Sequence, residues 1–267
     1  YCTPDSSKIQ GADESSRSTP QKRNIMEETR STASFEEKTS MGAPTLLHES
    51  QTEKESLLAQ MISIVLHPFF MGVYCIALLF FYSDFNLIFS GQFIRFMAPV
   101  FFLSCAVPTS SIYFLKKAGL IQNYGLSERN DRLIPYLVTF FAYCLLIYYF
   151  YTAKLFIWFL AVLIVPLLLT VIAAAVNIYW NISVHMMGIG GLIGTTLSVC
   201  YNIKGLNPFV LFIILFILAG CLGVSRLTLK RNTPAQVYIG FLVGLTASYL
   251  SVWVGTYWGF ILFLKNI

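Results

Sequence analysis

Charged residues are scarce in this chain of 267 residues: they make up 12% of it, whereas hydrophobic residues make up 56%. No ordinary soluble domain has such a composition. Acidic residues are the scarcest, because only Asp84, Glu128 and Asp131 occur after residue 57. Their near absence argues against hydrolases that use two carboxylates, and against transporters whose ion coupling uses Asp or Glu.

Metal-binding and disulfide patterns are missing as well. The six cysteines show no CxxC spacing, and five of them lie in apolar runs, where small buried hydrophobic residues are usual. There is no HExxH motif, and the glycines from Gly188 to Gly194 follow no predicted strand, so they are not a dinucleotide site. We therefore expect no disulfide framework, no metal and no cofactor. Nothing in the sequence indicates a nucleic-acid partner.

The charges that are present divide the chain into two parts. Residues 1–57 hold 7 Lys/Arg and 10 Asp/Glu, and residues 58–267 hold 11 Lys/Arg and 3 Asp/Glu, which gives net charges of −3 and +8. The first part has too few apolar residues to offset the entropy cost of ordering the chain. We predict a disordered polar tail over residues 1–56 and a cationic transmembrane domain over residues 57–267.

Long apolar runs dominate the second part. Most approach the roughly 20 residues that span about 30 Å of hydrocarbon as a helix, and they occupy residues 61–82, 93–115, 133–151, 156–179, 184–200, 207–224 and 234–263. The pattern predicts an all-α fold, a polytopic helical membrane bundle of six to seven transmembrane helices. The short, glycine-rich fifth run also allows a partly re-entrant segment, and the last run is long enough to extend beyond the bilayer.

The order of the runs places the polar groups. With seven crossings, the connections between runs two and three, four and five, and six and seven share one face of the membrane. These connections carry Arg129 and Arg132, then Ser183 and His185, then Ser225, Arg226, Lys230, Arg231 and Asn232. Seven Lys/Arg lie on this face and four on the other, so the positive-inside rule predicts that it is cytoplasmic.

Cations on this face suggest an anionic partner. Arg226, Lys230 and Arg231 precede a long apolar run, and cations at a bilayer boundary are costly unless they are paired. We interpret the partner as phosphate. Arg129 and Arg132 are three residues apart, so on one helical turn both side chains could bind the same phosphate group. Arg132 could equally form an ion pair with Glu128.

Two histidines lie near predicted helix starts on the same face. His185 precedes a run of glycines that lets a helix or ligand approach the backbone closely, and the residues alone leave a structural and a chemical role open. His67 precedes Pro68, where an imidazole commonly caps or packs the helix start, but it could instead line the same cavity. Nothing beyond these two histidines supports a haem.

Two stretches resemble motifs of the type 2 phosphatidic acid phosphatase superfamily of membrane lipid phosphatases. Residues 182–185, Ile-Ser-Val-His, resemble its Pro-Ser-Gly-His motif. Ser225-Arg226, followed by Asn232 and Gln236, resembles its motif of Ser-Arg, five residues, His, three residues and Asp. The likeness covers most of residues 61–244. It is to a bacterial branch of the superfamily and is clearest in the segments ISVHMMGIGG and TPAQVYIG. The first motif of the superfamily, Lys, six residues and Arg-Pro, is not matched.

The resemblance implies phosphoryl-transfer chemistry, and it also implies that two residues needed for this chemistry are replaced in the chain. In the superfamily one histidine attacks phosphorus, an aspartate orients it, a second histidine protonates the leaving alcohol, and arginines and a serine hold the phosphoryl oxygens. Carried over, His185 is the candidate acid or base, and the phosphate ligands are Ser183, Ser225, Arg226, Arg129 and Arg132. Asn232 and Gln236 stand at the positions of the nucleophile and its aspartate, and an amide cannot attack phosphorus.

We therefore expect an integral protein of the bacterial inner membrane that binds a phosphorylated lipid or isoprenyl phosphate, with weak or no hydrolysis. A non-catalytic membrane scaffold and a small transporter are the alternatives.

Overall fold

The long apolar runs form helices, because a segment in hydrocarbon must satisfy its backbone N–H and C=O groups internally. The structure is a computed structural model that describes residues 56–82, 85–119, 133–204 and 208–265. Every regular element in these residues is a helix, which confirms the predicted all-α class. They belong to one unit of the chain, Glu55–Ile267. The predicted disorder of the tail concerns residues outside the described ranges, apart from Ser56, where a helix begins.

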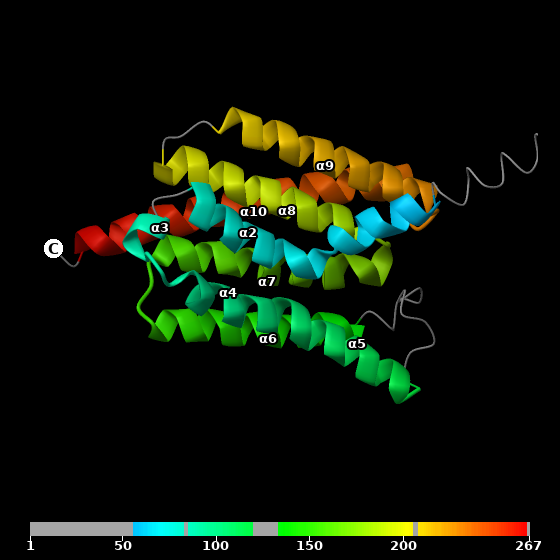
Figure 1. Ribbon diagram of the computed structural model, residues 1–267, viewed down its shortest axis with the longest axis horizontal. Helices are drawn as coiled ribbons and strands as arrows, with labels where there is room; N and C mark the ends of the chain where they lie inside the picture. Colours follow the sequence, from blue (N-terminus) through cyan, green and yellow to red (C-terminus); the bar gives the residue numbers. More distant parts are fainter. Residues whose placement is uncertain (1–55, 83–84, 120–132, 205–207, 266–267) are drawn as a thin grey trace, which may run out of the picture. The chain divides into compact units, whose positions relative to one another are not determined.

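The helices follow one another along the chain without any other regular element in the described ranges. The first half holds Ser56–Val65, α2 (Pro68–Tyr82), α3 (Phe85–Ile88), α4 (Phe93–Phe101), the π-helical turn η1 (Phe102–Ala106) and α5 (Val107–Lys117). The second half holds α6 (Leu133–Thr152), α7 (Ile157–Tyr179), α8 (Val184–Ser198), the π-helical turn η3 (Val199–Lys204), α9 (Phe209–Thr228) and α10 (Pro234–Lys265). The long helices lie roughly along one common axis, and α9 and α10 run in opposite directions along it (Figure 1).

Six helical segments among the described residues are long and apolar enough to cross a membrane, with α4, η1 and α5 counted as the single segment Phe93–Lys117. The bent pair Ser56–Val65 and Pro68–Phe81 would make a seventh span. The chain is therefore an integral membrane protein with a polytopic helical bundle, as predicted. With 32 residues, α10 is about 48 Å long at 1.5 Å per residue, so it exceeds the thickness of the hydrocarbon.

The apolar run of residues 61–82 contains a break between two helices. Its two helices meet at an angle of 56°, with a break at Leu66 and His67. The physical reason is Pro68, which has no backbone N–H and disfavours a helical conformation in the residue before it. The break sets the side chain of His67 between two helices instead of on the face of one.

Helix α8 is the centre of the bundle. Over an 18-residue stretch of its span, Val184–Ile203, 72% of the residues are buried, against 39% or fewer over the same length of each of the other five spans. It contacts α2, α7, α9 and α10, and it is continuous, so the possibility of a re-entrant segment is not realised (Figure 1). The glycine-rich composition that suggested re-entry instead serves close packing on all sides.

The tightest contact in the bundle joins α8 to α10. A Cβ added to Gly190 or Gly194 would collide with the carbonyl oxygen of Phe241 or Leu245, and one added to Gly244 would collide with the carbonyl oxygen of Met187. Backbones at this distance require glycine. The contact fixes the relative height of the two helices and therefore brings their first turns together.

Aromatic rings close the opposite end of the bundle. Phe85 is 1% exposed and stacks on Phe159 with ring centroids 5.1 Å apart, and Phe96 stacks on Phe150 at 5.6 Å. Such ring pairs add to the stabilisation that burial provides. This end is built for packing, and the polar groups described next lie at the other end of α7 and α8.

Candidate functional site

Helix ends gather the polar residues of the two resembling stretches. The first turn of α8 contributes Ser183 and His185, the last turn of α9 contributes Ser225 and Arg226, and the start of α10 follows Asn232. Because α8 packs on both α9 and α10, the connections that precede α8 and α10 lie side by side (Figure 1). The two connections, predicted only to share one face of the membrane, meet in a hydrogen bond, 3.2 Å from Ser183 Oγ to Asn232 Oδ1.

A tight turn at the end of α9 positions Arg226. Lys230 adopts a left-handed conformation with φ of 51°, the backbone N–H of Lys230 bonds the carbonyl of Leu227 at 2.9 Å, and that of Arg231 bonds the carbonyl of Arg226 at 3.2 Å. This pair of bonds is the Schellman pattern of a helix end. The chain thereby reverses within a few residues and returns Asn232 to the side chain of Arg226.

One amide oxygen lies at the centre of the site. Asn232 Oδ1 accepts a hydrogen bond from Arg226 Nε at 3.0 Å as well as the bond from Ser183 Oγ. Ser183 occupies the N-cap position of α8, yet its hydroxyl makes no cap bond. A capping serine contributes about 1 kcal/mol to a helix, so its hydroxyl is directed across the site at some cost to α8.

Gln236 lies where the resemblance places an orienting carboxylate, and it does orient its neighbours. Its Oε1 accepts hydrogen bonds from Asn232 Nδ2 at 3.2 Å and from the backbone N–H of Thr233 at 3.1 Å, while its own N–H donates to Thr233 Oγ1 at 3.4 Å. The exchange between Thr233 and Gln236 is a capping box at the start of α10. Gln236 therefore holds both the helix start and the amide of Asn232.

Ser225 faces away from this centre. Its hydroxyl donates to the carbonyl of Ala59 at 2.5 Å, and its oxygen lies 2.8 Å from Ser63 Oγ. Since Ser225 has only one proton to donate, Ser63 is the donor of the second bond. In this conformation Ser225 ties the Ser56–Val65 helix to α9, and its predicted role as a phosphate ligand stays a prediction.

The structure adds a residue that the sequence left undecided. The imidazoles of His67 and His185 are in contact, edge to face, with ring centroids 5.0 Å apart and an interplanar angle of 81°. The His185 side chain bonds the backbone of Ser63, and Arg226 is close enough to interact electrostatically with both imidazoles. The sequence offered one clue to this contact: the first apolar run, residues 61–82, begins on the membrane face that carries His185 and Arg226. The spacing of residues alone could not show that the two imidazoles touch.

Arg129 and Arg132, the other two predicted phosphate ligands, lie outside the described residues. Within the described ranges no group of three or more His, Cys, Asp or Glu could hold a metal ion. The same ranges contain no Asp or Glu at all. The site therefore offers hydrogen-bond donors, two imidazoles and positive charge.

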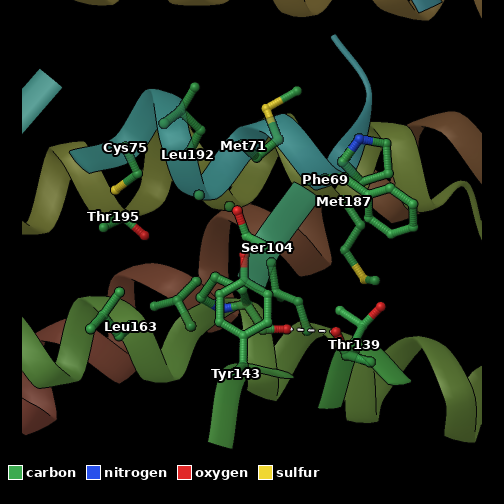
Figure 2. A pocket seen from close by; sticks show the side chains of 18 of the residues that line it. Phe69, Met71, Cys75, Ser104, Thr139, Tyr143, Leu163, Met187, Leu192 and Thr195 are labelled. Atoms are coloured by element: carbon green, nitrogen blue, oxygen red, sulfur yellow. Dashed lines mark hydrogen bonds between the residues drawn. The ribbon is translucent and has the colours of Figure 1, made fainter. Parts of the chain in front are cut away.

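An apolar cavity of about 100 Å³ lies among α2, α6, α7 and α8. It is lined mainly by side chains such as Met71, Leu163, Met187 and Leu192, with the hydroxyls of Ser104 and Tyr143 facing each other inside it (Figure 2). Its lining includes Pro68 and Phe69, which follow His67, and Val184, which precedes His185. Neither histidine lines the cavity, but residues next to both of them in the chain do.

None of the protein-family models, curated proteins or solved structures compared with the chain matches it. Its class is accordingly defined by the fold, that of an integral membrane protein with a polytopic helical bundle.

Proposed function

We propose that this protein binds the phosphorylated headgroup of a lipid in the membrane, with weak or no hydrolysis. One observation carries the proposal: donors from two different helix ends, Arg226 Nε and Ser183 Oγ, converge on the single oxygen of Asn232. A phosphoryl oxygen is a stronger acceptor than an amide oxygen, because hydrogen bonds to an ionised acceptor are roughly twice as strong as neutral ones. An incoming phosphate would therefore exchange with the amide oxygen.

The surroundings of this centre favour an anion. The first turns of α8 and α10 add partial positive charge from their backbone N–H groups, and the described ranges hold no carboxylate that would compete. The apolar cavity supports a lipid in particular, because residues next to His67 and His185 in the chain line it and its lining suits an apolar chain.

Weak or absent hydrolysis follows from Asn232. In-line phosphoryl transfer needs a nucleophile, and a neutral amide has no lone pair basic enough to serve. The likeness of residues 182–185 and 225–236 to the type 2 phosphatidic acid phosphatases supports phosphate as the ligand and the bacterial plasma membrane as the location. The hydrogen bond that Asn232 Nδ2 donates to Gln236 Oε1 keeps the pairing of positions 232 and 236 that this likeness implies, with two amides in place of the reactive groups.

The proposal is tested by comparing lipid binding after substitution of two arginines at the end of α9, one inside the site and one outside it. Purified protein in nanodiscs is titrated with lysophosphatidic acid, and Arg226→Ala is compared with Arg231→Ala, which removes the same charge from an exposed side chain five residues away. We expect binding by the wild type, a loss of about tenfold or more for Arg226→Ala, and a much smaller loss for Arg231→Ala. Phosphate release from phosphatidic acid, lysophosphatidic acid and isoprenyl diphosphates should stay near background.

Equal affinities in the two variants would overturn the assignment of Arg226. No binding by the wild type would favour the scaffold or the transporter, and turnover at ordinary enzyme rates would show that a nucleophile other than Asn232 operates.

A further inference from the structure

His67 is not among the residues whose hydrogen bonds to Asn232 are described above, yet its ring contacts that of His185 and it interacts electrostatically with Arg226. We propose that His67 is a direct ligand of the phosphoryl group and donates its Nε2 proton to a phosphoryl oxygen held by Arg226, beside His185. The inference rests on the proposed function, because it adds a third chain segment, the break in the first span, to the same site.

The hydrogen bonding of His67 decides which of its nitrogens can donate. The backbone N–H of Phe69 donates to His67 Nδ1 at 3.3 Å, so Nδ1 carries a lone pair. A neutral imidazole that accepts at Nδ1 carries its proton on Nε2. The ring also packs on Phe69, with centroids 4.6 Å apart, which restricts its rotation. His67 is thus held as a donor at Nε2.

The contact with His185 places that donor in the site. The two rings are 5.0 Å apart, and His185 is itself oriented by its bond to the backbone of Ser63. Arg226 is within electrostatic reach of both rings. Both imidazoles are half-buried, so they are neither sealed in the core nor free in solvent. The contact between the rings and their common interaction with Arg226 are the basis for assigning His67 to the same phosphate as Arg226.

The competing explanation is structural. His67 precedes Pro68 at the start of α2, and its bond from the N–H of Phe69 is an N-cap bond, which alone would explain the residue. The two explanations depend on different atoms of one ring: capping needs an acceptor at the position of Nδ1, and ligand binding needs a donor at the position of Nε2.

Two substitutions separate these atoms. His67→Asn keeps a short acceptor suited to capping α2 but lacks a group that reaches the position of Nε2. His67→Gln places an N–H donor near that position but caps less well. Each variant is titrated with lysophosphatidic acid in nanodiscs, with lysophosphatidylcholine as the control lipid, and its thermal unfolding is followed in parallel.

We expect His67→Asn to unfold like the wild type and to bind lysophosphatidic acid about tenfold more weakly, the loss typical of one hydrogen bond to a charged group. His67→Gln should retain most of the affinity even if it unfolds at a lower temperature. Neither should change the response to lysophosphatidylcholine.

The reverse pattern, with His67→Asn binding like the wild type and His67→Gln impaired, would overturn the proposal and leave His67 as a helix cap. Arg226→Ala in the same assay separates this failure from that of the proposed function. If Arg226→Ala weakens binding and His67→Asn does not, only the role of His67 is wrong. If the wild type does not bind, both proposals fall.

Discussion

Asn232 holds the polar site together because an amide can accept and donate at once. Its Oδ1 accepts hydrogen bonds from Arg226 and Ser183, and its Nδ2 group donates one to Gln236. An imidazole at this position could donate to residue 236 through one nitrogen and present the other to a ligand, provided that residue 236 is a carboxylate. The hydrogen bond of 3.2 Å between the two amides shows that the required neighbours are already in place.

Introducing a histidine at position 232 and an aspartate at position 236 should therefore create phosphatase activity. For the double variant Asn232→His with Gln236→Asp, we expect phosphate release from lysophosphatidic acid about 10²-fold above the wild type, because the changes supply both a nucleophile and an orienting carboxylate. Asn232→His alone should gain less, since Gln236 cannot stabilise a charged imidazole. The measurement is inorganic phosphate released by purified protein, with Arg226→Ala in the double background as the control. Unchanged binding without any release would contradict this reading of the site.

At the scale of elements, the contact between α8 and α10 decides where the site residues lie. Gly240 faces the carbonyl of Ser183, where an added Cβ would approach the oxygen to 2.8 Å, and Gly244 faces that of Met187 still more closely. The contact aligns the first turn of α8 with that of α10, and this alignment is what allows Ser183 to reach Asn232. A site residue is thus held by glycines several residues away.

A methyl group in this contact should loosen the bundle. We expect Gly244→Ala to lower the free energy of unfolding by about 1 to 3 kcal/mol, the usual cost of overpacking, because backbone cannot yield as a flexible side chain does. Gly220→Ala is the matched control: it lies in α9 with open space around an added Cβ, so the better helix propensity of alanine should leave stability equal or up to about 1 kcal/mol higher. Thermal and denaturant unfolding in detergent measure both, and an equal effect of the two changes would contradict the packing argument.

For the whole molecule, the crossing of α7 separates two connections. The α6–α7 connection contains Ala153, and α7 ends at Tyr179 close to the site, so Ala153 and the site should face opposite sides of the membrane. The site face also carries more Lys and Arg than the other, which favours the cytoplasmic side.

Cysteine labelling tests this topology. In a background without the native cysteines, we expect Ala153→Cys to react with a membrane-impermeant maleimide on intact cells, and Arg231→Cys to react only after permeabilisation; both positions are exposed. Identical behaviour of the two would contradict the opposite placement. The reverse pattern would contradict only the orientation.

Much of the site could be anticipated from local patterns, and the misses have a common cause. The order of the apolar runs placed residues 181–185 and 225–232 on one face, and the structure joins them through Ser183 and Asn232. Spacing could not show that Ser225 bonds Ala59 and Ser63, because those partners are more than 160 residues away in the chain. The contact between His67 and His185 was left undecided for the same reason.

The sequence by itself determined that this chain is a set of membrane-spanning helices with its polar connections on one face. Runs of about 20 apolar residues can satisfy their backbone in hydrocarbon only as helices, and each crossing reverses the side on which the next connection lies. Only the tertiary structure decided which helices touch, and so which donors share an acceptor. The packing of helices side by side depends on contacts such as that between Gly244 and the carbonyl of Met187. Such contacts join segments that are far apart in the chain, and neither segment carries a periodic pattern that reveals its partner.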